Sequence, residues 1–307
     1  MMRMQRVLAL DVGGTHIRMA WVDAEGVMGE EVRCRVDLSC HDACADDVMQ
    51  VIADMCQSYM QKHGGVDAVA LGFPGFFSGD DGVLLSSPNM PQLKDVALAD
   101  GLSAMLSCPV MAQNDALCAA LGEQRFGAGK GEEHLVHITL GTGVGAGLIL
   151  HKQAYTGASG MAMEFGHMML KRGADARLCG CGHRGCLEAY ASVTAIQAQY
   201  AEALGEDCDA AEIYQRALDG DALAQALFEQ AGAMLGQALA EVVKLLDVHT
   251  VTVSGGLLGA WRLLHAPLLD ALNEGVIAPQ RGKIQVLPST LGDAAGILGA
   301  AALALHA

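Results

Sequence analysis

Val7-Leu-Ala-Leu-Asp-Val-Gly-Gly-Thr-His-Ile-Arg-Met-Ala-Trp-Val22 joins two apolar runs through a turn at Gly13-Gly14. Each run has the length of one short strand, and paired glycines are typical of the tight turn of a hairpin. The same order returns at Leu135–His151, where the turn Gly141-Thr-Gly-Val-Gly145 again separates two strand patterns. Two copies of one strand–turn–strand unit predict a duplicated fold.

The rest of the chain alternates between strand and helix signals. The further predicted elements are strands at Val32–Val36, Ala68–Gly72, Val110–Ala112 and Thr250–Val253, and helices at Asp46–Tyr59, Ala116–Glu123, Leu223–Leu246 and Gly292–Leu305. Three strands followed by helix, strand, helix and strand resemble half of an actin-like (ribonuclease-H-like) fold. We therefore predict a duplicated α/β fold of two domains, 1–118 completed by 293–307, and 119–292, with a cleft between them.

Composition favours an α/β enzyme. Hydrophobic residues make up 52% of the 307 residues, only 4% are aromatic and 38 are glycine, which suits aliphatic strands and close backbone contacts. The net charge of −16 argues against a nucleic-acid partner, which would need clustered basic side chains. No apolar run approaches the roughly 20 residues of a membrane span, and no separate signal core precedes the first strand. We expect a cytoplasmic protein whose ten cysteines are reduced or bound to metal.

A run of cysteines and glycines from Glu164 to Glu188 predicts a metal site. Cys179, Cys181 and Cys186 lie within eight residues of one another, and His167 lies twelve residues before the first of them. One imidazole and three thiolates close a tetrahedral Zn²⁺ site with no open position, so this zinc would be structural. The alternative is a loop of reduced thiols without metal.

The two glycine turns are candidate phosphate sites. Glycines let backbone amides approach phosphate oxygens, and Thr15 adds a hydroxyl donor after Gly13-Gly14. Asp11, at the end of the first strand, is a candidate Mg²⁺ ligand. The second turn, with Thr142 and Gly143, lacks the lysine of a P-loop. Each turn by itself could equally be an ordinary hairpin.

Acidic residues supply candidate groups for catalysis and binding. Asp115 follows a strand and opens a helix, where it could cap the helix or accept a proton from a substrate hydroxyl. Glu164 and Glu188 flank the cysteine segment, and their carboxylates could accept bonds from sugar hydroxyls. Solvated surface positions are the alternative for both glutamates.

Taken together and in this order, these motifs resemble the ROK family (repressors, open reading frames, kinases). The resemblance implies an actin-like two-domain fold, ATP with Mg²⁺, structural Zn²⁺, and phosphoryl transfer to a sugar hydroxyl. By matching position, Asp115 resembles the catalytic base. The residues that resemble substrate contacts are Asn89, Asn114, Asp115, Glu164, His167 and Glu188. Those that resemble ATP or Mg²⁺ contacts are Asp11, Gly13, Gly14, Thr15, Thr142, Gly143, Gly255 and Gly256.

Three residues depart from the pattern of the family. His16 stands where many members have lysine, Met163 stands where glycine is usual before Glu164, and Ser254 stands where a third glycine is common. A bulkier residue beside Glu164 could reshape a sugar pocket.

The resemblance leaves the substrate open. We expect a glucokinase that phosphorylates the 6-hydroxyl, with allose, mannose, fructose or an N-acetylhexosamine as alternative sugars and polyphosphate as an alternative donor. A sugar-sensing repressor is less favoured because little sequence precedes Asp11. An actin-like ATPase would leave Glu164, His167 and Glu188 without a role. We also expect a homodimer.

Overall fold

The structure, a computed structural model, describes residues 6–13, 15–36, 38, 44–79 and 81–306. Gly14, in the first predicted phosphate turn, lies outside the described residues. The chain divides into two compact units, one of residues 1–131, 147–162 and 290–307, the other of residues 132–146 and 163–289. The domain boundaries expected from the sequence, 1–118 and 119–292, stay a prediction.

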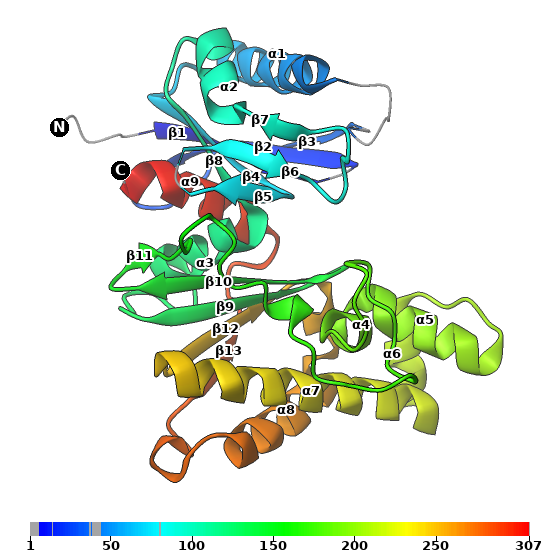
Figure 1. Cartoon of the computed structure of the whole chain (residues 1–307). Coiled ribbons are helices and arrows are strands. Elements are labelled where there is room, and N and C mark those ends of the chain that lie inside the picture. Colours follow the sequence, from blue (N-terminus) through cyan, green and yellow to red (C-terminus); the bar gives the residue numbers. More distant parts are fainter. Residues whose placement is uncertain (1–5, 14, 37, 39–43, 80, 307) are drawn as a thin grey trace. The chain divides into compact units, whose positions relative to one another are not determined.

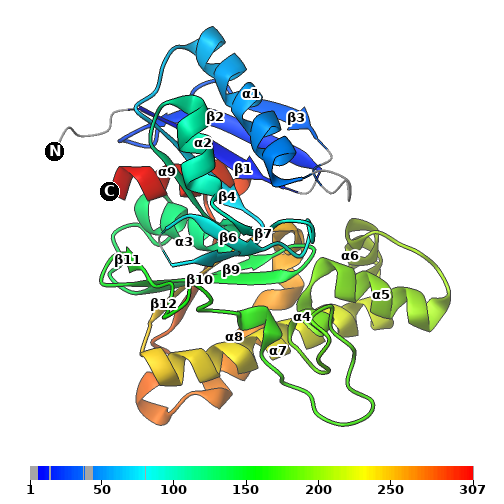
Figure 2. The same cartoon turned by 45° about the horizontal axis from the view of Figure 1, so that its top comes forward.

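The first unit is built on a five-stranded sheet with helices on both faces (Figures 1 and 2). Its strands, in the spatial order β3-β2-β1-β4-β8, are β1 (Arg6–Val12), β2 (His16–Asp23), β3 (Val32–Arg35), β4 (Ala68–Phe73) and β8 (Val110–Asn114). β2 runs antiparallel to β1, and β4 runs parallel to it. Leu8 and Leu10 pack with buried residues of α1 (Ala45–His63) on one face, while Ala9 packs with residues of α9 (Ala295–His306) on the other.

A close helix crossing fixes the start of α3 (Asp115–Phe126). A Cβ atom built on Gly122 of α3 would lie 2.9 Å from the Cα atom of Gly299 of α9, so only glycine lets these helices approach so closely. Because α9 also packs on β1 and β4, this crossing holds α3 against the sheet. Asp115, the first residue of α3, is therefore placed by the core rather than by a loop.

A small three-stranded sheet in the first unit was not predicted. It consists of β5 (Phe76–Ser78), β6 (Val83–Ser86) and β7 (Lys94–Val96), in that order, and is followed by α2 (Leu98–Leu106). Strands of three or four residues interrupted by glycine and proline are too short to establish a period in the sequence.

The second sheet repeats the strand order of the first. Its strands, in the spatial order β11-β10-β9-β12-β13, are β9 (Leu135–Leu140), β10 (Val144–Leu150), β11 (Gln153–Ala154), β12 (Thr250–Ser254) and β13 (Gln285–Pro288). Counted by appearance in the chain, both sheets read 3-2-1-4-5. The predicted duplication and the actin-like (ribonuclease-H-like) fold are confirmed.

Two long helices, α7 (Ala222–Leu246) and α8 (Trp261–Gly275), pack side by side beneath this sheet (Figure 1). The backbone oxygens of Leu264 and Leu268 in α8 occupy the space that a side chain at Gly232 or Gly236 of α7 would need. The other α-helices in the described part of the chain are α4 (Glu188–Ala191), α5 (Val193–Leu204) and α6 (Ala210–Leu218). Short 3₁₀ turns lie at Phe165–His167, Gly256–Ala260, Ala278–Gln280 and Gly292–Ala294. None of the helices in the described residues is long and apolar enough to span a membrane.

Candidate functional site

Asp115 is not the cap of its helix. The N-cap of α3 is Asn114, whose side-chain oxygen accepts hydrogen bonds from the backbone amides of Ala116 (3.0 Å) and Leu117 (3.1 Å). The Asn114 amide nitrogen donates to the carbonyl oxygen of Gly75 at 3.0 Å, which leaves it one more N–H. Asp115 Oδ1 also accepts from the Ala116 amide at 2.9 Å, but Asn114 already caps that amide, so capping alone gives no reason for a carboxylate at position 115.

The environment of Asp115 suits a proton acceptor. The surrounding protein desolvates the carboxylate and raises its pKa to about 6, against the lowering effect of the Ala116 amide, while the negative charge of Asp11 raises the pKa further. The side chain still has solvent-accessible surface, so a ligand can reach it. A carboxylate with a pKa near 6 is deprotonated at neutral pH yet basic enough to accept a proton.

This pKa predicts the acid limb of the activity. If Asp115 is the base, kcat/KM should fall about tenfold per pH unit below pH 6, because the protonated acid cannot accept a hydroxyl proton. A pH–rate profile measures the limb, and circular dichroism at each pH checks that the protein stays folded. A limb near pH 4, the ordinary range of a carboxylate, would contradict this assignment.

Asp11 is held in place by an ion pair with Arg18. Arg18 lies opposite Asp11 in the β1–β2 register, and its Nη2 atom is 2.8 Å from Asp11 Oδ2. The turn between these strands is closed by the Gly13 amide, which donates to the carbonyl oxygen of His16 at 2.8 Å. Thr15 is exposed, and its hydroxyl lies 3.0 Å from His16 Nδ1. Position 18 could have been found from the sequence, because hairpin pairing places it across from position 11.

In the second unit, Glu188 ties the second glycine turn to the cysteine segment. Its Oε2 atom accepts a hydrogen bond from the backbone amide of Val144 at 3.0 Å, and its Oε1 atom lies 3.6 Å from Cys179 Sγ. A Cβ atom on Gly143 would collide with this carboxylate. A side chain at position 143 would therefore push the Glu188 carboxylate away from the Val144 amide.

The turn after β12 lies against the end of β9. Gly255 has a φ of 98°, in the left-handed region that favours glycine, and a side chain there would collide with the backbone of Leu140. Gly256 has open space where a side chain would be. The turns that contain Thr142-Gly143 and Gly255-Gly256 thus start from adjacent parallel strands, β9 and β12.

Four side chains form a candidate metal centre in the second unit. The ligand atoms of His167, Cys179, Cys181 and Cys186 all lie within 4.8 Å of one another. The Cys181 and Cys186 sulfurs are 3.7 Å apart, as are Cys179 Sγ and His167 Nδ1. Ligands at zinc–sulfur distance on a tetrahedron are separated by about 3.8 Å. The donor set and its spacing therefore fit Zn²⁺. None of the nine cysteines in the described part of the chain forms a disulfide.

The two nitrogens of His167 face different groups. Nδ1 faces the cysteine cluster, whereas Nε2 lies 3.8 Å from Glu164 Oε2. Desolvation raises the pKa of Glu164, His167 lowers it and Glu188 raises it. Met163, directly before this glutamate, has a φ of 66°. This left-handed conformation explains physically why glycine suits that position, and it makes Met163 a locally strained residue.

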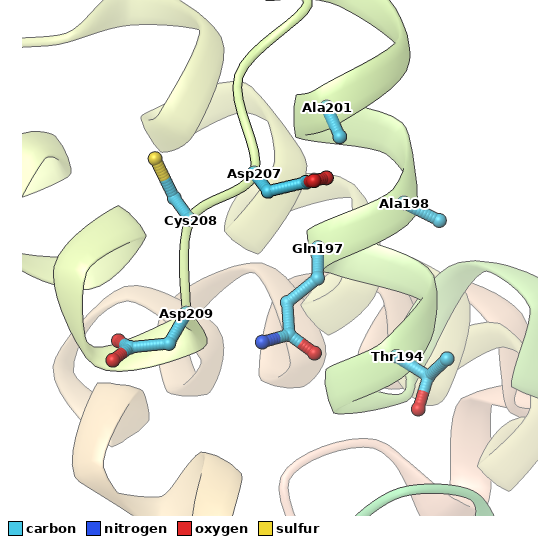
Figure 3. Close-up of a pocket in the computed structure, with 7 residues that line it drawn as sticks. All are labelled: Thr194, Gln197, Ala198, Ala201, Asp207, Cys208 and Asp209. Carbon is cyan, nitrogen blue, oxygen red and sulfur yellow. The ribbon is translucent and has the colours of Figure 1, made fainter.

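Other parts of the surface contribute less. Asn89 is exposed in the loop between β6 and β7, and no substrate contact follows from its position alone. A surface pocket of about 450 Å³ is lined by Thr194, Gln197, Ala198 and Ala201 of α5 and by Asp207, Cys208 and Asp209 (Figure 3). None of the predicted site residues lines it. The roles assigned to the site residues from the sequence stay predictions.

Comparison with known proteins gives full-length matches. The model of the ROK family matches residues 7–307. The glucokinase of Thermotoga maritima is 31% identical over 315 residues, which cover 97% of this chain and 96% of that protein. An N-acetylgalactosamine kinase of Shewanella is 31% identical over 304 residues, or 96% and 95% of the two chains. The structure of a ROK family glucokinase from Streptomyces griseus, in complex with glucose and AMPPNP, has a TM-score of 0.81 at 31% identity and covers 97% of this chain and 98% of its own.

Proposed function

The chain belongs to the ROK family, and from this premise we propose that it transfers the γ-phosphoryl group of ATP to the 6-hydroxyl of a hexose, with glucose preferred. It is an ATP-dependent sugar kinase. The observation that supports the chemistry best is Asp115, an accessible carboxylate with a pKa raised to about 6. Asn114 caps the helix in its place.

In this proposal the first unit supplies the base and a metal ligand. Asp115 accepts the proton of the attacking hydroxyl, which raises the electron density on the oxygen as it bonds to phosphorus. Asp11, held in place by Arg18, would be the ligand for Mg²⁺. When bound, this ion would neutralise charge on the phosphate oxygens of ATP. The hydroxyl of Thr15 and the backbone amides of the Thr142–Gly143 turn would contact those oxygens.

The second unit supplies acceptors for the sugar ring. Glu164 keeps an accessible carboxylate, and the Nε2 atom of His167 faces it. If Nδ1 of His167 ligates zinc, its Nε2 atom would carry the ring proton and would donate it to a hydroxyl oxygen of the sugar. One carboxylate oxygen of Glu188 already accepts a hydrogen bond from the Val144 amide, so the other oxygen is the acceptor proposed for the sugar. Asn89 and Asn114 remain proposed sugar contacts of the first unit.

We favour glucose as the substrate because of the similarity of this chain to relatives whose names or structures include glucose. The Thermotoga maritima relative is named a glucokinase, and the Streptomyces griseus structure contains glucose. The Shewanella relative, named an N-acetylgalactosamine kinase, matches equally well by identity, which favours an N-acetylhexosamine as the second candidate. Met163, which directly precedes Glu164 and has a left-handed backbone conformation, stands where the family pattern has glycine.

This proposal is tested by identifying the product and by comparing activity on several sugars. With ATP and glucose, NMR of the product should show phosphate on the 6-oxygen, and 6-deoxyglucose should not react. Hexoses and N-acetylhexosamines compared by kcat/KM identify the preferred sugar. Met163→Gly in the same panel shows whether position 163 affects the preference. Phosphate on the anomeric oxygen, or turnover of the 6-deoxy sugar, would overturn the proposed orientation.

Changing either flanking glutamate should weaken sugar use specifically. Glu164→Gln and Glu188→Gln should each cost about 1–3 kcal/mol in kcat/KM for glucose, because a sugar hydroxyl loses its charged acceptor. The KM for ATP should change little in Glu164→Gln, whereas Glu188→Gln also changes the acceptor of the Val144 amide beside the Gly143 turn. Glu241→Gln, an exposed glutamate on α7 that pairs with Lys244, is the control and should behave as wild type. Equal kcat/KM in the control and in both variants would remove these glutamates from the sugar site.

A further inference from the structure

A buried histidine lies beneath the turns at the ends of β9 and β12. His137, in the middle of β9, has no exposed surface. Its Nδ1 atom lies 2.9 Å from Thr252 Oγ1, and its Nε2 atom lies 2.8 Å from Ser254 Oγ. Burial lowers the pKa of His137 to about 3, so the ring is neutral and has one N–H donor and one acceptor nitrogen. The chemistry proposed above gives this residue no role.

The contacts of His137 continue toward the glycine turns. Ser254 Oγ lies 3.4 Å from Thr139 Oγ1, and these two residues are partners in the β9–β12 register. Ser254 directly precedes Gly255-Gly256, and Thr139 lies two residues before Gly141. We call Thr252, His137, Ser254 and Thr139 the polar ladder. It begins in the buried interior of the sheet and ends where both strands give way to their turns.

The ladder can be hydrogen-bonded in two directions. With the ring proton on Nδ1, His137 donates to Thr252, Ser254 donates to Nε2, and Thr139 donates to Ser254. With the proton on Nε2, His137 donates to Ser254, Ser254 donates to Thr139, and the proton of Thr139 is left for another acceptor. Only the second arrangement ends in an available donor. A phosphate oxygen is an acceptor, and hydrogen bonds to anionic acceptors are the stronger ones.

We propose that His137 is a positioning residue of the nucleotide site, which holds Ser254 at the start of the Gly255-Gly256 turn and directs the hydroxyl of Thr139 toward a nucleotide phosphate. This inference rests on the proposed use of ATP. The binding of nucleotide selects the Nε2-protonated ring. The serine at position 254 is what connects His137 to the turn, so the two residues act as a pair.

NMR of the ring nitrogens tests the direction of the ladder on the wild-type protein. ¹⁵N chemical shifts distinguish the two tautomers of a neutral histidine, and the His137 signals are assigned by comparison with a His137→Gln variant. Addition of AMPPNP should move the His137 ring toward the Nε2-protonated form, whereas addition of glucose alone should not. A ring whose tautomer is the same with and without AMPPNP would overturn the proposal.

A matched set of variants tests the consequence for ATP. Asparagine reproduces the Nδ1 position of a histidine ring and glutamine the Nε2 position. His137→Leu and His137→Asn should raise the KM for ATP about 5- to 10-fold, as expected for one lost hydrogen bond, with the KM for glucose unchanged. His137→Gln should stay within about twofold of wild type, because its amide donates to Ser254. Thr250→Val, at a buried threonine of β12 outside the ladder, is the control and should stay close to wild type.

The outcomes separate this inference from the proposed function. Melting temperatures identify any variant that fails to fold, and the NMR experiment needs no variant with altered stability. If wild-type protein binds AMPPNP but all His137 variants change the KM values for ATP and glucose together, His137 has only a structural role. If wild-type protein binds no nucleotide by calorimetry, both the proposed function and this inference are wrong.

Discussion

Asp115→Asn should lower kcat by roughly 10²- to 10⁴-fold, the usual contribution of a general base. The amide has the shape of the carboxylate but cannot accept the proton of the attacking hydroxyl. Helix capping is retained, because Asn114 and not Asp115 caps α3. The dissociation constants for ATP and glucose, measured by calorimetry, should stay close to those of wild type, so the loss falls on kcat.

The same variant should not lose stability. The pKa of Asp115 is raised in the folded protein from 3.8 to about 6, so the charged carboxylate disfavours the folded state. The contribution of Asp115 to the free energy of unfolding falls as the pH rises from 3.8 to about 6, and it stays at this lower value at higher pH. Removing the charge should leave the melting temperature at neutral pH equal to or above that of wild type. Asp46→Asn, an exposed acid in the first turn of α1, is the matched control. Near wild-type kcat in Asp115→Asn would show that the residue is not the base.

Loss of the proposed zinc should have the largest effect on folding. Metal analysis of purified protein should find about one zinc per chain, the count for one closed four-ligand site. Removal of zinc by a chelator should lower the melting temperature and raise the KM for glucose, because thiolate ligation couples metal binding to the folding of the segment. Glu188 connects the cysteine segment to the Gly143 turn through the Val144 amide. Disorder of the metal-free segment should therefore also disorder this turn.

Cysteine variants locate the metal. Cys179→Ser and Cys186→Ser, both at buried ligands, should lose zinc and melt at a lower temperature. Cys208→Ser changes a cysteine of the same unit outside the cluster and should keep both zinc and melting temperature. Metal-free protein with full activity and an unchanged melting temperature would exclude a structural zinc. Zinc retained in both ligand variants would place it elsewhere.

Much of the fold follows from local pattern. The strand at Leu135–Leu140 was predicted with its observed bounds, and the helix at Leu223–Leu246 begins one residue earlier in the structure. Each of these elements has enough residues to show the hydrophobic pattern of a strand or a helix, so the pattern that predicts it lies within one segment. The strands β5 to β7 could not be predicted in this way, because three or four residues do not establish a period.

Part of the candidate site also follows from the sequence alone. The ligand set of His167, Cys179, Cys181 and Cys186 is within a short stretch, and the structure brings their ligand atoms together. Asp115 was identified, but its competing role as a helix cap was resolved only when the side chain of Asn114 was seen to occupy the cap. A cap depends on the conformation of one residue, which the sequence Asn-Asp leaves open between two good candidates.

The sequence by itself determined the duplicated strand–turn–strand plan, the metal ligand set and the family, because each is written in the spacing of neighbouring residues. Only the tertiary structure decided the partnerships across strands and between distant segments. Glu188 with Val144, and His137 with Ser254, join residues 44 and 117 positions apart. The energy of such contacts depends on strand register and burial, which are set by the packing of the whole sheet. No local pattern contains that information.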